Sequence, residues 1–106
     1  MSWNQHHSRS EKLAANAEVA SRSGDARRAE ELYRQAASAE AEAFDDLAIG
    51  KLRTRGITAV SAVALSYKAR DYVAAARLAH RYLAALELPP FAEVQLRELL
   101  HLTNRK

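Results

Sequence analysis

Apolar residues recur at intervals of three and four along most of the chain, which is the spacing of an amphipathic helix. We therefore predict an all-α fold of about five helices, over residues 8–23, 25–44, 54–69 (or 56–69), 71–86 and 91–102. Ser8 or Ser10 is expected to cap the first helix, because a serine side chain accepts hydrogen bonds from first-turn amides. The pair Pro89 and Pro90 is expected to stop the chain from continuing the fourth helix.

The predicted helices differ in how much of their surface is apolar. The first has a shallow apolar face made of small residues, so its partner helix must come close. The third is apolar on almost every side, which is typical of a helix that is touched from both faces, and we expect it to be central. The fifth resembles a lid on the open end of a helical stack.

Two segments of the chain resemble each other. Residues 20–33 and 66–78 both read as the end of a helix, a tight turn, and a second helix that opens with aspartate and has alanine four residues later. In the first copy Gly24 precedes Asp25, where a left-handed conformation favours glycine. In the second copy Arg70 precedes Asp71. This repetition predicts two antiparallel helical hairpins followed by a C-terminal capping helix.

The remaining segments are predicted to be irregular. Residues 1–7 are polar apart from one tryptophan and are expected to form a flexible tail. Residues 45–56 contain two glycines and are expected to connect the hairpins, with or without a short helical turn. Residues 103–106 are expected to fray, which leaves residues 8–102 as a single helical domain.

Composition supports a small helical protein and excludes several classes of function. Alanine is the most frequent of the 106 residues, and only three glycines and two prolines interrupt the chain. No cysteine is present, so disulfides and thiol chemistry are excluded. No apolar run approaches the ~20 residues that span a bilayer, and residues 1–7 lack the apolar core of a secretory signal. We expect a cytoplasmic protein without a membrane partner.

Charge is distributed unevenly along the chain, whose net charge is +3. Residues 1–50 hold six Lys/Arg and nine Asp/Glu, a balance of −3, whereas residues 51–106 hold ten and four, a balance of +6. Such polarity can steer an acidic partner or a second copy of the chain. Two solvated faces that differ by accident would give the same pattern.

The repeated segment resembles the tetratricopeptide repeat, a helical-hairpin family. The register fits at Ala17, Gly24, Asp25, Ala29, Tyr33 and Ala36, and again at Asp71, Tyr72, Ala75 and Ala79. The two turns are 46 residues apart (71 minus 25), whereas tandem repeats of this kind recur every ~34 residues. Residues 45–56 account for the insertion. Residues 53–72 also resemble a bacterial tetratricopeptide-like family of no established activity.

The resemblance implies a protein-protein interaction module, an adaptor or assembly subunit, whose first-helix side chains line a concave groove for a peptide or helical partner. The positions carried over are Glu11, Ala14, Glu18, Ser21 and Arg22, with Ile57, Val60, Ala64, Tyr67 and Lys68. Tyr67 and Lys68 form an aromatic and cationic pair that suits a carboxylate. Alternatively, Ile57, Val60 and Tyr67 are core residues or lie under the C-terminal helix.

Two further interpretations stay open. The basic half of the chain, residues 51–106, could bind RNA or DNA through Arg53 and Arg55, with Tyr67 or Tyr72 stacking on bases. No recognised nucleic-acid-binding motif is present. The other basic residues of this stripe are Lys51, Lys68, Arg70, Arg77 and Arg81. Two hairpins bury little core, so pairing of two chains into a homo-oligomer, most simply a dimer, would extend the stack.

No arrangement of residues predicts catalysis. His6 and His7 are adjacent on the expected tail and lack the geometry of a metal site, and His80 and His101 lie on predicted helices. No glycine-rich phosphate loop, nucleophile elbow or His-Glu helix motif occurs. We expect a non-enzymatic protein with no catalytic residue, no cofactor and no metal.

Overall fold

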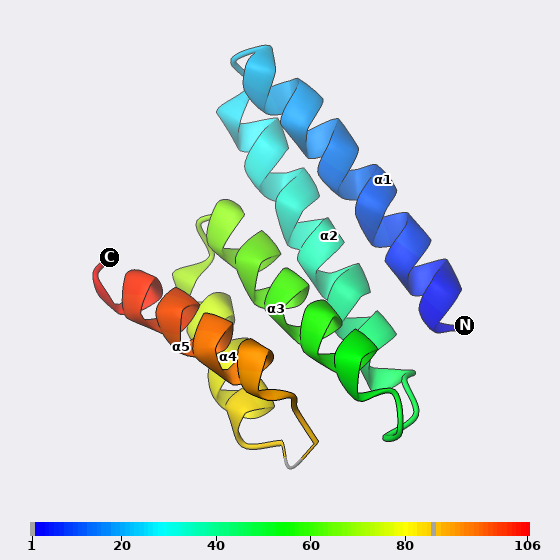
Figure 1. The fold of residues 1–106 in the computed structure, drawn as a ribbon. Helices are drawn as coiled ribbons and strands as arrows, with labels where there is room; N and C mark the ends of the chain where they lie inside the picture. The colour runs from blue at the N-terminus through cyan, green and yellow to red at the C-terminus, as the bar shows by residue number, and fades with distance from the viewer. Residues whose placement is uncertain (1, 86) are drawn as a thin grey trace.

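The computed structural model describes residues 2–85 and 87–106. In these residues every regular element is a helix, which confirms the all-α prediction (Figure 1). The five helices are α1 (Trp3–Arg22), α2 (Ala26–Asp45), α3 (Leu52–Lys68), α4 (Tyr72–Leu83) and α5 (Pro90–Asn104).

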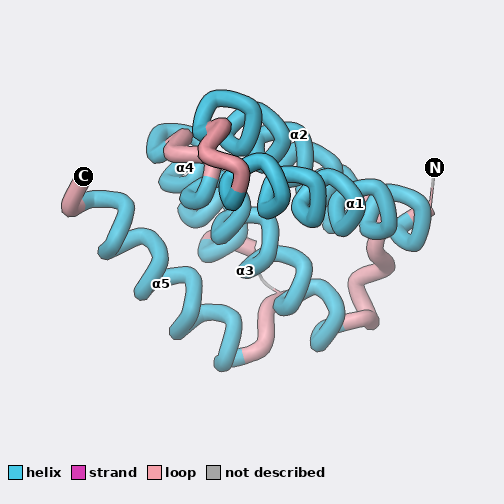
Figure 2. The backbone as a smooth tube through the Cα atoms, turned by 90° about the horizontal axis from the view of Figure 1, so that it is seen from above, coloured by secondary structure: helices cyan, strands magenta, loops and turns pink. Residues whose placement is uncertain are grey.

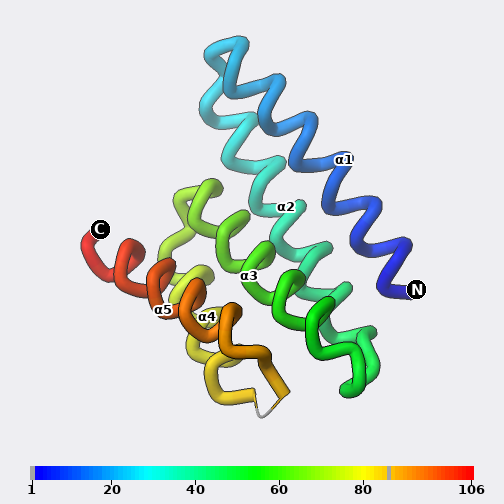
Figure 3. The backbone as a smooth tube through the Cα atoms, viewed as in Figure 1, coloured from blue at the N-terminus to red at the C-terminus, as the bar shows by residue number. Residues whose placement is uncertain are grey.

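The helices form two antiparallel hairpins and a C-terminal helix, as expected. α1 packs on α2, α3 packs on α4, and α5 packs on both helices of the second hairpin. α3 contacts α2, α4 and α5, so the prediction that this apolar helix is central is confirmed. α2 and α4 lie in one layer, and α3 and α5 lie beside each other in the layer below it in Figure 2. Both hairpin turns point toward the same end of the molecule (Figure 3).

The core brings the helices close together because it is built largely from small residues. Alanines fill the contacts around α3 and α4, and the larger side chains Val63, Tyr82 and Leu96 are fully buried among them. The rings of Phe44 and Tyr82 lie 4.4 Å apart between centroids. Burial raises the pKa of the Tyr82 hydroxyl well above its usual range, because the charged form would lose its water.

Gly56 allows α3 to approach the start of α5. A Cβ atom at this position would lie 2.6 Å from Cγ of Pro89 and 3.0 Å from the Cβ of Ala92. Such distances are below van der Waals contact, so only glycine fits without movement of α5. The second glycine of the predicted connector therefore belongs to a helix interface.

The two hairpin turns share one hydrogen-bond pattern. In each turn the amide before the aspartate donates to the carbonyl three residues back, and the aspartate amide donates to the carbonyl five residues back, at 2.9–3.1 Å. This is the Schellman motif, which needs a left-handed residue. Gly24 supplies it at φ 82°, and Arg70 supplies it at φ 58°. The repetition in sequence is therefore a repetition of backbone geometry.

The aspartates after the turns also have equal roles. Asp25 and Asp71 adopt nearly the same backbone angles, with φ −93° and −92° and ψ 78° and 75°. Each side chain accepts a hydrogen bond from the amide three residues on, at 3.1 Å for Asp25 and 3.2 Å for Asp71. Both aspartates cap the helix that follows them.

The expectation of a flexible tail over residues 1–7 is wrong for residues 3–7, which form the first turns of α1; Met1 lies outside the described residues. Ser2, and not Ser8 or Ser10, caps the helix through a capping box with Gln5. Trp3 stacks on His7 with ring centroids 4.6 Å apart, and its indole nitrogen donates to the Thr58 hydroxyl at 3.1 Å. A contact with α3 thus orders the start of α1.

Two histidines join this part of α1 to α2. His7 Nδ1 lies 3.0 Å from a carboxylate oxygen of Glu40, which is only 1% exposed. His6 lies between Glu42 and Asp46, at 3.0 Å and 3.1 Å. A buried carboxylate needs a hydrogen-bonding partner, so His7 supports the position of Glu40 in the core.

Other boundaries also differ from expectation. α3 begins at Leu52, so the connector is shorter than residues 45–56. α4 ends at Leu83, before residue 86, and Leu86 lies outside the described residues. The tail was expected to fray from residue 103, but α5 continues to Asn104 and Thr103 is buried. Packing of α5 on the second hairpin extends it, and Pro90 suits its first position because that amide needs no helical partner.

Arg70→Gly is expected to raise the free energy of unfolding by up to about 1 kcal/mol, since glycine adopts the left-handed conformation without a Cβ penalty. Gly24→Ala is expected to lower it by about 1–2 kcal/mol for the same reason. Urea denaturation measures both. Gly50→Ala is the control, because Gly50 has open space around it and no positive φ. A loss of stability in Arg70→Gly equal to that in Gly24→Ala would contradict the equivalence of the turns.

His7→Ala is expected to lower the free energy of unfolding by about 1–3 kcal/mol, because it leaves the buried Glu40 carboxylate without its partner. Thermal and urea denaturation at constant pH measure the change. His80→Ala is the matched control, since His80 is exposed on α4. Adding Glu40→Gln to His7→Ala is expected to recover part of the loss by removing the buried charge. Equal effects of His7→Ala and His80→Ala would refute this role.

Candidate interaction groove

A groove lies between α2 and α4. Each of these helices packs closely on α3, and they also contact each other through the rings of Phe44 and Tyr82. The space between them has a volume of about 340 Å³. Ser66 of α3 contributes to its floor. Figure 2 shows the two helices together in one layer, above the layer that holds α3 and α5.

Small and aliphatic side chains line the floor and walls of the groove. Ala37 and Ala41 come from α2, and Ala74 and Leu78 come from α4. On each helix the two positions are four residues apart, so they lie on one stripe along the groove. Short side chains keep this surface low, and a large apolar side chain of a binding partner could reach the helix surfaces here.

Three arginines stand along the rim. Arg34 comes from α2, and Arg77 and Arg81 come from α4. α4 rises about 9 Å between Asp71 and Arg77, and about 15 Å between Asp71 and Arg81. The cationic groups are therefore spread along the whole groove, and an extended anionic partner could contact each of them along its length.

Two ion pairs join the hairpins across the groove, one at each end. Arg34 Nε lies 3.7 Å from an Asp71 carboxylate oxygen. Arg81 Nη2 lies 2.6 Å from an Asp45 carboxylate oxygen. Each pair takes its arginine from one hairpin and its aspartate from the other. All four side chains remain substantially exposed, so each pair contributes only about 0–1 kcal/mol.

Arg77 stands between these two pairs. Among residues 2–85 and 87–106, no carboxylate lies within 4.0 Å of its guanidinium. The side chain is exposed on α4. The groove therefore combines an apolar floor, an arginine without a described carboxylate partner at its centre, and an ion-paired arginine at each end.

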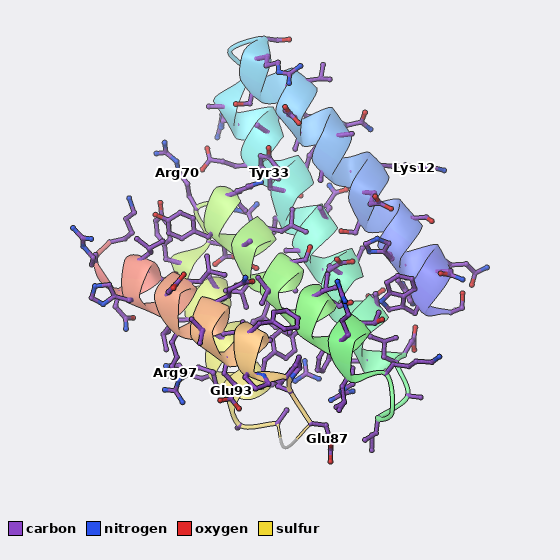
Figure 4. All side chains as sticks on the ribbon, viewed as in Figure 1. Lys12, Tyr33, Arg70, Glu87, Glu93 and Arg97 are labelled. Atoms are coloured by element: carbon purple, nitrogen blue, oxygen red, sulfur yellow. The ribbon has the colours of Figure 1, made fainter. Side chains whose placement is uncertain are left out.

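The partner-binding residues predicted from the sequence lie elsewhere. Glu18 and Arg22 form an ion pair with each other on the exposed surface of α1. Tyr67 is half-buried and packs edge-on against Tyr72, with ring centroids 5.5 Å apart. The Lys68 ammonium lies 5.8 Å from the centroid of Tyr33, near the end of the molecule that holds the hairpin turns (Figure 4).

Arg53 and Arg55 lie at the opposite end of α3, about 22 Å along the axis between Arg53 and Lys68. Arg53 is exposed. Arg55 lies over the Phe44 ring, 4.5 Å from its centroid, and its Nε donates to the carbonyl of Glu87 at 3.4 Å. The six predicted residues thus fall in three separate places, and none of them lines the α2–α4 groove.

The basic stripe expected for nucleic acid is also divided. Arg77 and Arg81 line the groove, whereas Lys68 and Arg70 lie at the α3–α4 turn. The residue that the sequence analysis missed is Arg34, which belongs to the first hairpin. A signal for it existed in Ala37, Ser38 and Ala41, which follow it by three, four and seven residues, because small residues at these spacings share its face of the helix.

Comparisons with protein-family models, with curated proteins and with solved structures give no match to this chain. No described helix combines the length and apolar character needed to cross a membrane. Within the described residues, no three histidine, aspartate or glutamate side chains are arranged to hold a metal ion.

Proposed function

We propose that this chain is a non-enzymatic protein-protein interaction module, an adaptor or assembly subunit, which binds a helical or peptide segment of its partner in the α2–α4 groove. The observation that carries this proposal is the groove itself, with its apolar floor and three arginines. Arginine is enriched at protein interfaces, where its planar head pairs with carboxylates and its stem covers apolar surface.

The form of the groove favours a rod-like segment. It runs along two helices for about 15 Å, which is the length of nearly three helical turns. Amphipathic helices commonly bind by laying an apolar face into such a groove. The alanine floor accepts the apolar face, and the arginines contact the flanking polar positions.

The repeated turns support a helical-repeat architecture of the tetratricopeptide kind. Gly24 and Arg70 have equivalent left-handed conformations, and Asp25 and Asp71 have equivalent capping roles. In repeat proteins each hairpin contacts its neighbours and side chains of several hairpins form one binding surface. The α2–α4 groove follows this rule, because Arg34 comes from one hairpin and Arg77 from the other.

Selection of displayed random peptides on the folded protein tests this function. Peptides enriched on the wild type are expected to lose at least about tenfold in affinity for Ser38→Trp, since Ser38 lines the groove and is exposed, and an indole would fill the space. Gln95→Trp on the exposed face of α5 is the matched control and should bind as the wild type does.

Circular dichroism and thermal denaturation would show that both tryptophan variants are folded. Failure to enrich any peptide would contradict the proposed function. Peptides that bind Ser38→Trp as well as the wild type would exclude the groove as the site.

A further inference from the structure

We propose that the partner segment is an acidic helix, and that Asp45 and Asp71 hold the rim arginines in the place of its carboxylates until it binds. This inference rests on the proposed function, because it assigns a chemistry to the occupant of the same groove. It makes the two cross-groove ion pairs internal competitors of the partner.

The geometry of the ion pairs points to this role. Asp71 lies 3.7 Å from Arg34 at one end of the groove, where Arg34 also pairs with Glu31 of its own helix, and Asp45 contacts Arg81 at the other end. Each carboxylate reaches its arginine across the gap between the hairpins, which is the direction from which a partner lying in the groove would present its own carboxylates. The same arginines therefore have both an internal and an external acceptor within reach.

An exchange of acceptors is energetically accessible. Both pairs are exposed to water, where an ion pair contributes little because each charge is solvated and screened. A partner helix that covers the groove would remove water from the arginines and strengthen their charge-assisted hydrogen bonds. The external carboxylates would thus replace the internal ones as the groove closes.

The positions of the arginines set the spacing of the acidic residues. Relative to the Arg34–Asp71 end, Arg77 lies about 9 Å and Arg81 about 15 Å farther along α4. A partner helix parallel to α4 presents residues i, i+7 and i+11 on one face, at rises of about 10 Å and 16 Å. Glutamate or aspartate at these positions matches the three arginines.

The apolar floor of the groove determines which partner residues fit between the acidic positions. Positions i+3, i+4 and i+8 of the same helix face Ala37, Ala41, Ala74 and Leu78, where a leucine or phenylalanine can be buried. None of the described residues that line the groove is aromatic, so it offers no aromatic platform on which nucleotide bases could stack. An acidic amphipathic helix fits both the rim and the floor, and we choose it over a nucleic acid for this reason.

The test uses a displayed library of amphipathic helical peptides, selected on the wild-type protein, with affinities of the enriched peptides then measured on charge variants. Acidic residues are expected to be enriched at i, i+7 and i+11. Arg77→Gln is expected to weaken binding about tenfold, because it removes a charge-assisted contact. Arg27→Gln, on the exposed first turn of α2, is its control and should have no effect.

The decisive variants are those that remove an internal competitor. Asp45→Asn is expected to tighten binding about two- to fivefold, since Arg81 no longer has to leave its own carboxylate. Asp71→Asn is expected to tighten it less, because Arg34 also donates a hydrogen bond to Glu31 at 2.7 Å. Asparagine caps a helix as well as aspartate does, so Asp71→Asn keeps the start of α4. Asp25→Asn is the matched control, because it makes the same change at the equivalent cap, where no described ion pair crosses the groove.

The outcomes separate this inference from the proposed function. Enriched peptides without acidic residues at these positions would overturn the inference, as would weaker binding to Asp45→Asn and Asp71→Asn, while leaving the groove as a binding site. A single-stranded RNA that binds more tightly than every peptide and loses affinity with Arg77→Gln would assign the groove to a polyanion and overturn it as well. Absence of any groove-dependent peptide would remove the proposed function itself.

Discussion

The close packing of α3 against three other helices is the constraint on which this structure depends. Ala59 and Ala62 are fully buried on α3, and Gly56 lets the start of α5 come within contact of it. Because α2 and α4 both pack on α3, they are held side by side, and the rings of Phe44 and Tyr82 are in contact between them. The groove between them is a consequence of this arrangement, and its floor is low because the same stretches of helix are rich in alanine.

Local signals in the sequence predicted the hairpins well. A Schellman turn and an aspartate cap are formed by neighbouring residues, so Gly24, Asp25 and Asp71 could be placed without knowledge of the tertiary structure. The helix ends were less predictable where distant residues decide them. Trp3 donates a hydrogen bond to Thr58, and His7 contacts Glu40. These contacts make the start of α1 helical, although its polar composition is typical of a flexible tail.

The candidate site was less accessible to sequence analysis than the fold. The spacing of residues along one helix fixes which face they share, but it does not fix how one hairpin sits on the next. Arg34 and Arg77 are far apart in sequence, and only the packing of both hairpins on α3 brings them to one groove. Conversely, Tyr67, Lys68, Arg53 and Arg55 looked like one basic and aromatic surface, but α3 places them near its two ends. Their role in partner binding stays a prediction.

The side of the molecule that carries α2 and α4 is the proposed binding surface. Backbone amide chemical shifts, followed while a selected peptide is titrated into the labelled protein, test this most directly. We expect the changes to cluster at residues 34–45 and 71–81, with little change on α1 and α5. Changes confined to the faces of α1, α3 and α5, with the groove residues unaffected, would contradict it.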